Sequence, residues 1–213
     1  MPGRTTSLAN GEVYHIYNRG SEKRNIFTQT RDYKRFKQTF YYYQFSGPKP
    51  RLSISSLSSF QPNLNNKLVD ILCFCLMPNH FHFMVKQLKD NGISTFMSQV
   101  ANSYTKYFNI KYNRVGPLLQ GAFKAVLVES GGQLIHLSRY IHLNPVVSGI
   151  CKAPGDYFWS SFGEYMNQDD ICSTRLVLDL FPSKEKYKEF TDDQIDYGKT
   201  LETAKHQLID LEN

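Results

Sequence analysis

The chain has 213 residues, of which 41% are apolar, 14% aromatic and 21% charged, with a net charge of +6. These values are ordinary for a soluble globular protein, and the longest apolar run, residues 71–77, is too short to cross a bilayer. The four cysteines form no C-x-x-C pair, which excludes a zinc ribbon or a thioredoxin motif. With no apolar leader near Met1, we expect a cytoplasmic protein with reduced cysteines and no membrane partner.

The positive charge is concentrated in the main body of the chain. Residues 184–213 hold five Lys against eight acidic residues, a net of −3, whereas the remainder holds 20 basic and 11 acidic residues, a net of +9. A basic excess favours a polyanionic partner without identifying it. We therefore expect the body, and not the C-terminal tail, to lie against such a partner.

The N-terminal part of the chain predicts a strand, a helix and a long loop. Residues 13–17 are aromatic and β-branched and predict a strand that ends at Asn18-Arg19-Gly20. Asp32 is the expected N-cap of a helix that runs to about Tyr43. Residues 44–67 are rich in Ser, Pro and Asn, which indicates a loop or insertion.

The next segments predict a hairpin, an amphipathic helix, a strand and a third helix. The hairpin pairs residues 69–76 with residues 80–85 through a Met-Pro-Asn turn. The later elements are a helix over 93–110, a strand over 123–128 and a helix over 133–143 that ends before Pro145.

The resulting order is β-α-β-β-α-β followed by a helix, which predicts an α+β fold of the ferredoxin-like type. We expect residues 1–165 to form this domain, with the insertion at about 44–67. Residues 159–162 are expected to pack back on the body. Residues 166–213 are expected to form a C-terminal extension that is acidic and helical from Lys184.

The triplet His80-Phe81-His82 is the first candidate for chemistry. Residues i and i+2 of a strand share a face, so both imidazoles point one way, on the less covered face, while Phe81 points to the core. Two His ligands leave a divalent ion open positions for oxygen ligands, which suits a catalytic site more than a closed structural one. An H-x-H triplet also arises by chance, so the triplet alone does not establish a metal site.

The second candidate is the helix that carries Tyr140 and Asn144. Positions i and i+4 share a helix face, so both side chains can point to one place. A phenol can act as a covalent nucleophile, and an amide oxygen is a suitable ligand for Mg²⁺ or Mn²⁺. The residues alone do not select Tyr140 over Tyr104 or Tyr107, and Asn144-Pro145 is also an ordinary helix stop.

Four motifs together resemble a known family. They are residues 14–20 (YHIYNRG), 77–82 (MPNHFH), 116–121 (GPLLQG) and 140–145 (YIHLNP). Their order and spacing resemble the HUH single-tyrosine transposases, which are insertion-sequence-200-like, and most of all the REP-associated tyrosine transposases. The resemblance runs from about Tyr14 to Phe162.

The resemblance implies a DNA transposase that cleaves and rejoins single-stranded, hairpin-associated DNA. It implies that His80, His82 and Asn144 bind Mg²⁺ or Mn²⁺, and that Tyr140 forms a 5′-phosphotyrosine intermediate. Its partner would be single-stranded DNA with a hairpin or palindromic repeat. The protein would be a monomer or a homodimer that exchanges the tyrosine helix.

Three further residues are candidate DNA contacts: Arg19, Gln120 and Lys124. Ala122 stands where the family often has an Arg, so a phosphate contact there would have to come from Lys124 or elsewhere. Solvated surface positions are the alternative for all three. His15 is expected to be a core histidine or a support for a ligand, and not a ligand itself.

A cluster of basic and aromatic residues in the second helix allows two interpretations. It contains Lys106, Lys111, Arg114, Tyr104, Tyr107 and Tyr112. Such a mixture suits a single nucleic-acid strand, and it equally suits a solvated helix end.

Two other functions stay open on the sequence. A ferredoxin-like sheet can bind single strands without catalysis, as RNA-recognition modules do. A metal hydrolase of small phosphoesters would use water instead of Tyr140.

Overall fold

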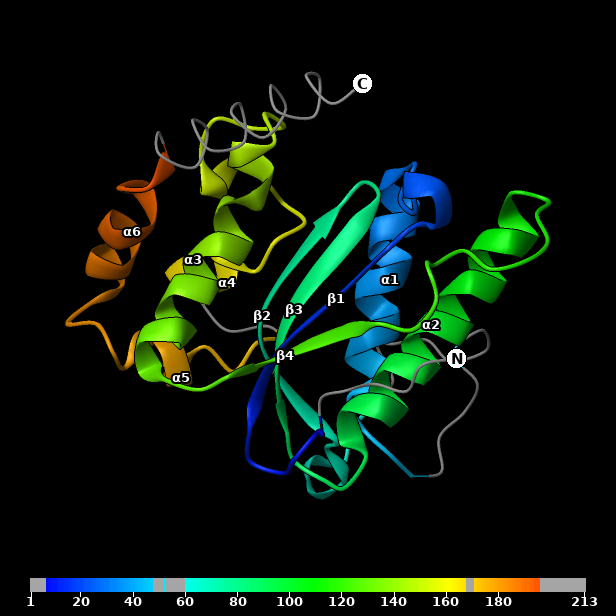
Figure 1. Ribbon diagram of the computed structural model, residues 1–213, viewed down its shortest axis with the longest axis horizontal. Coiled ribbons are helices and arrows are strands. Elements are labelled where there is room, and N and C mark those ends of the chain that lie inside the picture. The colour runs from blue at the N-terminus through cyan, green and yellow to red at the C-terminus, as the bar shows by residue number, and fades with distance from the viewer. Residues whose placement is uncertain (1–6, 48–51, 53–59, 168–170, 196–213) are drawn as a thin grey trace. The chain divides into compact units, whose positions relative to one another are not determined.

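The computed structural model describes residues 7–47, 52, 60–167 and 171–195 (Figure 1). The chain divides into two compact units. The first unit comprises residues 1–71 and 78–128, and the second comprises residues 72–77 and 129–213. The predicted C-terminal extension lies within the second unit, and residues 196–213 fall outside the described part.

Four strands form one sheet in the order β2-β3-β1-β4. Their bounds are β1 Val13–Arg19, β2 Val69–Met77, β3 His80–Gln87 and β4 Lys124–Val128. β1 is antiparallel to both β3 and β4. The predicted α+β class and the β-α-β-β-α-β order are confirmed, and the strand order is the one that a ferredoxin-like arrangement requires.

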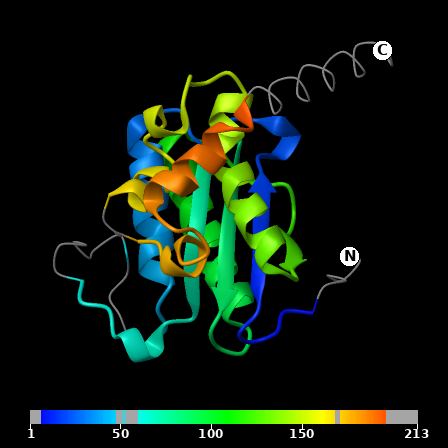
Figure 2. The ribbon, with the colours of Figure 1, turned by 90° about the vertical axis from the view of Figure 1, so that its left-hand side faces the viewer.

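In the first unit, α1 (Thr30–Tyr43) and α2 (Gly92–Lys111) pack against each other on one side of the strands (Figures 1 and 2). Phe81 and Phe83 of β3 are fully buried, and their rings lie 5.2 Å and 6.2 Å from the ring of Phe36 on α1. This arrangement confirms that the residues alternating with the histidines face the helix-covered core. Short 3₁₀ turns at Ser21–Lys23 (η1) and Leu64–Asn66 (η3) complete the unit.

The N-terminus of α1 corrects one prediction. Asp32 is not the N-cap, because the helix begins at Thr30 and Gln29 is its N-cap. Asp32 is the third helical residue, and its carboxylate accepts the backbone N–H of Gln29 at 3.0 Å in a capping box. An N-cap carboxylate accepts from the N–H of the second or third helical residue, whereas Asp32 accepts from the N–H of the N-cap residue, so the prediction placed the N-cap three residues too late.

The described parts of the 44–67 segment close its two ends together. The backbone N–H of Leu68 donates to Gln44 at 2.7 Å, and that of Ser46 donates to Asn66 at 2.8 Å. Residues 48–51 and 53–59 lie outside the described residues. The segment therefore leaves and rejoins the fold at one place, as an insertion between α1 and β2 does.

The second unit is mainly helical. It holds α3 (Gly131–Val147), η4 (Pro154–Asp156), α4 (Phe162–Met166), α5 (Arg175–Leu178) and α6 (Lys184–Asp192). Residues 72–77 of β2 belong to this unit, and the loop between η4 and α4 pairs with them. The backbone N–H of Leu76 donates to the carbonyl of Trp159, and the N–H of Ser161 donates to the carbonyl of Phe74, both at 2.9 Å. Residues 159–162 thus pack as predicted.

The third helix does not stop before Pro145, as the sequence predicted, but continues to Val147. Proline has no backbone N–H, so Pro145 cannot donate to the carbonyl four residues before it, and its ring crowds that carbonyl. Pro145 and Val146 are buried, so their packing offsets that loss. Within the described ranges, no helix is long and apolar enough to span a bilayer.

Candidate functional site

β3 presents His80 and His82 on one face of the sheet, beside two residues of β1. The register places His80 opposite Arg19 and His82 opposite Tyr17. The rings of His80 and His82 lie 5.0 Å apart between centroids. The predicted pair of imidazoles on one strand face is therefore present.

A neighbour engages the Nδ1 atom of each histidine. His80 Nδ1 lies 2.6 Å from the side-chain oxygen of Asn79. An amide oxygen only accepts, so this Nδ1 carries the proton and the lone pair of the ring is on Nε2. His82 Nδ1 lies 2.9 Å from His15 Nε2, and if His82 donates here its lone pair is likewise on Nε2. Such outer contacts fix the tautomer and the ring orientation of metal-binding histidines.

Burial keeps the imidazoles of His82 and His15 neutral. His82 is only 6% exposed, and burial, followed by its neighbours His15 and His80, holds its pKa well below the ordinary value. Burial also lowers the pKa of His15 to about 4. A neutral imidazole is the form that binds a metal. The open face expected for both histidines is found only in part, because His80 is half-buried and His82 is buried.

The predicted DNA contacts gather at the same end of the sheet as the histidines. Arg19, opposite His80, is exposed and its Nε donates to Gln120, whose backbone N–H donates back to the carbonyl of Arg19 at 2.8 Å. Lys124 begins β4 opposite Tyr17, which itself lies opposite His82. Arg19, Gln120 and Lys124 thus present exposed donors at the end of the sheet where the histidine pair lies.

Four members of the basic and aromatic cluster near the C-terminal end of α2 make contacts within the fold. Tyr104 is fully buried and donates to the carbonyl of Ile26. Tyr107, Lys111 and Tyr112 all donate to the carboxylate of Asp32, at 3.0, 2.6 and 2.7 Å. The hydroxyl groups of these three tyrosines and the ammonium group of Lys111 are therefore engaged within the fold.

The helix α3 carries Tyr140 and Asn144 on one face. Tyr140 is 50% exposed and Asn144 is half-buried. Both belong to the second unit, whereas the histidines belong to the first. Their convergence on the histidine pair therefore stays a prediction from the motifs.

Within the described ranges, no three His, Cys, Asp or Glu side chains converge as a metal site. A metal at the histidine pair would therefore need a further donor of another kind, such as an amide or phosphate oxygen. Amide and phosphate oxygens are ligands of Mg²⁺ and Mn²⁺, whereas imidazole nitrogens are more often ligands of transition metals, so Mn²⁺ would suit two imidazoles better than Mg²⁺.

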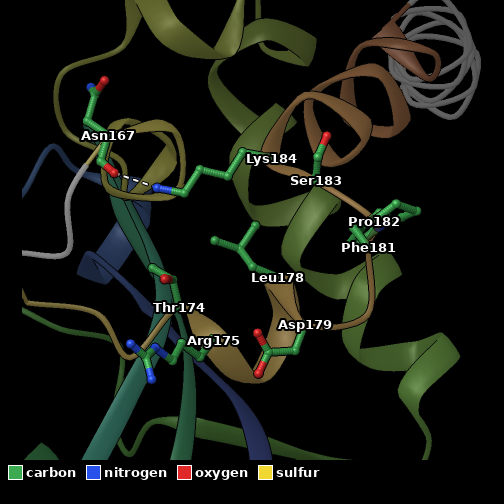
Figure 3. Close-up of a pocket in the computed structure, with 9 residues that line it drawn as sticks. All are labelled: Asn167, Thr174, Arg175, Leu178, Asp179, Phe181, Pro182, Ser183 and Lys184. Atoms are coloured by element: carbon green, nitrogen blue, oxygen red, sulfur yellow. Dashed lines mark hydrogen bonds between the residues drawn. The ribbon is translucent and has the colours of Figure 1, made fainter.

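The second unit has a cavity of about 750 Å³ around the start of α6 (Figure 3). Its lining residues are Asn167, Thr174, Arg175, Leu178, Asp179, Phe181, Pro182, Ser183 and Lys184. Lys184 crosses it and donates to the carbonyl of Asn167 at 2.5 Å. None of the predicted site residues lines this cavity, so it is separate from the candidate chemistry.

Two histidines have contacts that sequence reasoning did not identify. The alternation of β1 places His15 on the same face as Tyr17, but no local pattern indicates that it meets His82, 67 residues later. His142 lies inside the YIHLNP motif, and both of its ring nitrogens are engaged in the core of the second unit. The sequence signal that could have pointed to His142 is its position inside the motif, between Tyr140 and Asn144.

Comparisons with known proteins support the resemblance inferred from the motifs. A family model described as "Transposase IS200 like" matches residues 49–144, just under half of the chain. This stretch contains His80, His82, Tyr140 and Asn144, and it excludes Arg19. No curated protein matches the chain.

Solved structures share the fold. One of them is a REP-associated tyrosine transposase bound to a REP hairpin, at 15% identity and a TM-score of 0.56, covering 79% of this chain and 87% of that one. The predicted recognition of the insertion-sequence-200-like family is confirmed over residues 49–144, and the fold is confirmed by the structure.

Proposed function

We propose that this chain is a transposase that cuts and rejoins single-stranded DNA through a covalent link to Tyr140. The observation that carries the proposal is the His80–His82 pair, with both Nδ1 atoms engaged, inside a sequence stretch that matches IS200-like transposases. The same stretch contains Tyr140 and ends at Asn144.

In the proposed reaction, the phenol oxygen of Tyr140 attacks the phosphorus of a phosphodiester. The new bond joins Tyr140 to the 5′-phosphate, and the bond from phosphorus to the 3′-oxygen breaks. The phenol loses its proton, and the departing 3′-oxygen gains one to become a hydroxyl. Attack by a second 3′-hydroxyl reverses these steps and joins strands, so no nucleotide cofactor is needed.

His80, His82 and Asn144 would hold Mg²⁺ or Mn²⁺ in this proposal. A divalent ion held there would supply Lewis-acid polarisation of the scissile phosphate. Asn79 and His15 support the proposal because they engage the Nδ1 atoms and favour Nε2 as the ligand atom. Arg19, Gln120 and Lys124 would bind the DNA backbone beside the histidines.

The proposed partner is a DNA strand next to a hairpin or palindrome. The support is the matched structure, which is bound to a REP hairpin, and the net charge of +9 outside the C-terminal segment. The recognised sequence is expected among short imperfect palindromes that flank the gene.

The test is formation of a covalent adduct. The protein is incubated with Mn²⁺ and a labelled single-stranded oligonucleotide library, and adducts are resolved on a denaturing gel. Tyr140→Phe should reduce the adduct by more than about 100-fold, because the phenyl ring retains no nucleophile. Tyr41→Phe, on α1, is the matched control and should form the adduct normally.

Other outcomes would point to the alternative functions. Cleavage without an adduct, unchanged in Tyr140→Phe, would indicate water as the nucleophile. DNA binding without any adduct, unchanged by EDTA and by combined His80→Ala and His82→Ala, would indicate a non-catalytic binding module. Equal adducts from Tyr140→Phe and the wild type would show that another residue is the nucleophile.

A further inference from the structure

The face of α3 opposite Tyr140 and Asn144 is fixed by buried polar groups. An α-helix turns 100° per residue, so Tyr140 and Asn144 each lie about 160° around the axis from His142. His142 is fully buried, whereas Tyr140 is half-exposed. His142 thus lies on the helix face opposite the one that would carry the nucleophile and the amide ligand.

His142 is bonded at both ring nitrogens to elements other than α3. Its Nδ1 lies 2.7 Å from the hydroxyl of Tyr187 on α6. Its Nε2 lies 2.9 Å from the hydroxyl of Ser161, which also accepts the backbone N–H of Phe74 on β2. One imidazole therefore joins α3 to α6 and to β2 within the second unit.

The hydrogen-bond chain assigns the tautomer of His142. The hydroxyl of Ser138 donates to the carbonyl of Ile135 at 2.8 Å, so it accepts from Tyr187 at 3.1 Å. Tyr187 has one hydroxyl proton, and its oxygen must then accept the Nδ1–H of His142. His142 Nε2 is left as an acceptor, with the thiol of Cys73 at 3.3 Å and the hydroxyl of Ser161 at 2.9 Å as its neighbours, and the Ser161 hydroxyl also lies 3.2 Å from the carbonyl of Phe74. Burial lowers the pKa of His142 to about 3, in keeping with this neutral form.

A second contact joins α6 to α3 beside the nucleophile position. Arg139 stacks on the ring of Phe190 at 4.0 Å, and its Nη1 donates to the carbonyl of Phe190 at 3.1 Å. Arg139 immediately precedes Tyr140 in the chain. α6 begins at Lys184, well beyond residue 144, where the family match ends.

We infer that His142 and Tyr187 are positioning residues that fix the rotation of α3 and thereby aim Tyr140 and Asn144, with α6 as a brace outside the family-matched stretch. The inference rests on the proposed function of Tyr140. An apolar side chain would fill the same space, but apolar contacts are not directional. Hydrogen bonds at both ring nitrogens restrict the helix to one rotation, and covalent chemistry tolerates little misplacement of the nucleophile.

The test compares two tyrosines of the same core. Tyr187→Phe removes the acceptor of His142 Nδ1–H. Tyr165→Phe is the matched control, because its hydroxyl donates to the carbonyl of Leu72 at 2.7 Å, and its ring, which lies 4.7 Å from that of His142, is kept in the variant. Both variants lose one buried hydroxyl and keep the ring, so their melting temperatures should fall by similar amounts.

The kinetic readout is single-turnover adduct formation over a range of DNA concentrations. Tyr187→Phe should lower the maximal rate about tenfold with an unchanged half-saturating concentration, since misalignment affects the chemical step and not DNA binding. Tyr165→Phe should change the rate less than about twofold. Equal slowing in both variants would overturn the inference, because it would show a general effect of stability.

Two readouts do not depend on activity. Imidazole ¹⁵N NMR should show His142 protonated at Nδ1 in the wild type, and this signature should be lost in Tyr187→Phe. Hydrogen exchange of residues 138–146 should rise in Tyr187→Phe and not in Tyr165→Phe. Protonation of His142 at Nε2, or unchanged hydrogen exchange in Tyr187→Phe, would contradict the positioning role of His142 and Tyr187.

These readouts test the positioning role of His142 and Tyr187 separately from the proposed function. If the wild type forms no adduct, the proposed function fails. NMR and hydrogen exchange still show whether His142 and Tyr187 fix the rotation of α3. If Tyr187→Phe does not fold, Phe190→Leu removes only the ring beneath Arg139 and should slow adduct formation in the same manner. An unchanged rate in Phe190→Leu would exclude α6 as a brace.

Discussion

At the scale of single residues, the two buried histidines His82 and His142 have different hydrogen-bond partners. Burial lowers the pKa of both His82 and His142, so neither carries charge at neutral pH. His142 uses both ring nitrogens within the protein, which excludes it as a metal ligand. His82 is joined to His15 through Nδ1, the arrangement in which Nε2 serves as the ligand atom.

This difference predicts an effect of His15 on metal binding. His15→Leu removes the acceptor for His82 Nδ1–H and should weaken Mn²⁺ binding by about 10- to 100-fold, as loss of an outer-shell partner does. His15→Gln can place its amide oxygen near the former Nε2 and should bind Mn²⁺ more tightly than His15→Leu. Calorimetric titration measures both affinities. Equal affinities for the wild type and His15→Leu would show that His15 does not orient His82.

At the scale of elements, the carboxylate of Asp32 links α1 to α2. It accepts hydrogen bonds from Tyr107, Lys111 and Tyr112 of α2 and its C-cap, and from the backbone N–H groups of Thr28 and Gln29. Burial alone would raise the pKa of Asp32, but its hydrogen bonds, with Lys111 the strongest, hold it at about 2. The ordinary value is 3.8, so the folded state favours the charged form.

The lowered pKa sets the direction of the pH dependence. The stabilisation from Asp32 is present above about pH 4 and is lost as the pH falls toward 2, because the unfolded chain takes up the proton first. Asp32→Asn should lower the free energy of unfolding at pH 7 by about 3 kcal/mol, as breaking a buried ion pair does. Urea unfolding at pH 7 and at pH 2.5 measures the difference, which should shrink at the lower pH.

An exposed ion pair on α6 provides the control for Asp32. Glu189 pairs with Lys186 at 2.7 Å, and both side chains are more than half exposed. Solvent screens such pairs, so Glu189→Gln should leave the free energy of unfolding nearly unchanged at both pH values. A pH-independent difference between Asp32→Asn and the wild type would contradict the role of the charged carboxylate.

The elements could be predicted from local patterns, and their ends less well. Alternation along β3 and helical spacing along α2 placed these elements within about two residues. The errors came where burial outweighed local preference. Pro145 continues α3 because it is buried in the last turn, and Asp32 is three residues inside its helix because α2 supplies its partners.

At the scale of the whole molecule, the sequence indicates candidate site residues but not the distant residues that contact them. His80, His82, Tyr140 and Asn144 follow from motifs of a few residues. The contacts of His82 with His15 and of His142 with Tyr187 join residues 67 and 45 positions apart. Strand alternation and helix periodicity indicate a face, but they carry no information about which distant residue meets it.

The charge of the molecule predicts how its DNA binding responds to salt. Contacts between cations and phosphates release counterions, so the logarithm of the binding constant falls with the logarithm of salt concentration by about 0.7 per phosphate on a single strand.

Lys124→Ala and Arg19→Ala should each weaken DNA binding and reduce this slope by about 0.7 if each residue meets one phosphate. Lys188→Ala is the control, because Lys188 pairs with Asp192 in the acidic C-terminal segment and should leave the slope unchanged. Fluorescence anisotropy of a labelled strand between about 50 and 200 mM salt measures the slopes. A slope that falls in Lys188→Ala and not in Lys124→Ala would place the DNA on α6 instead of beside the histidine pair.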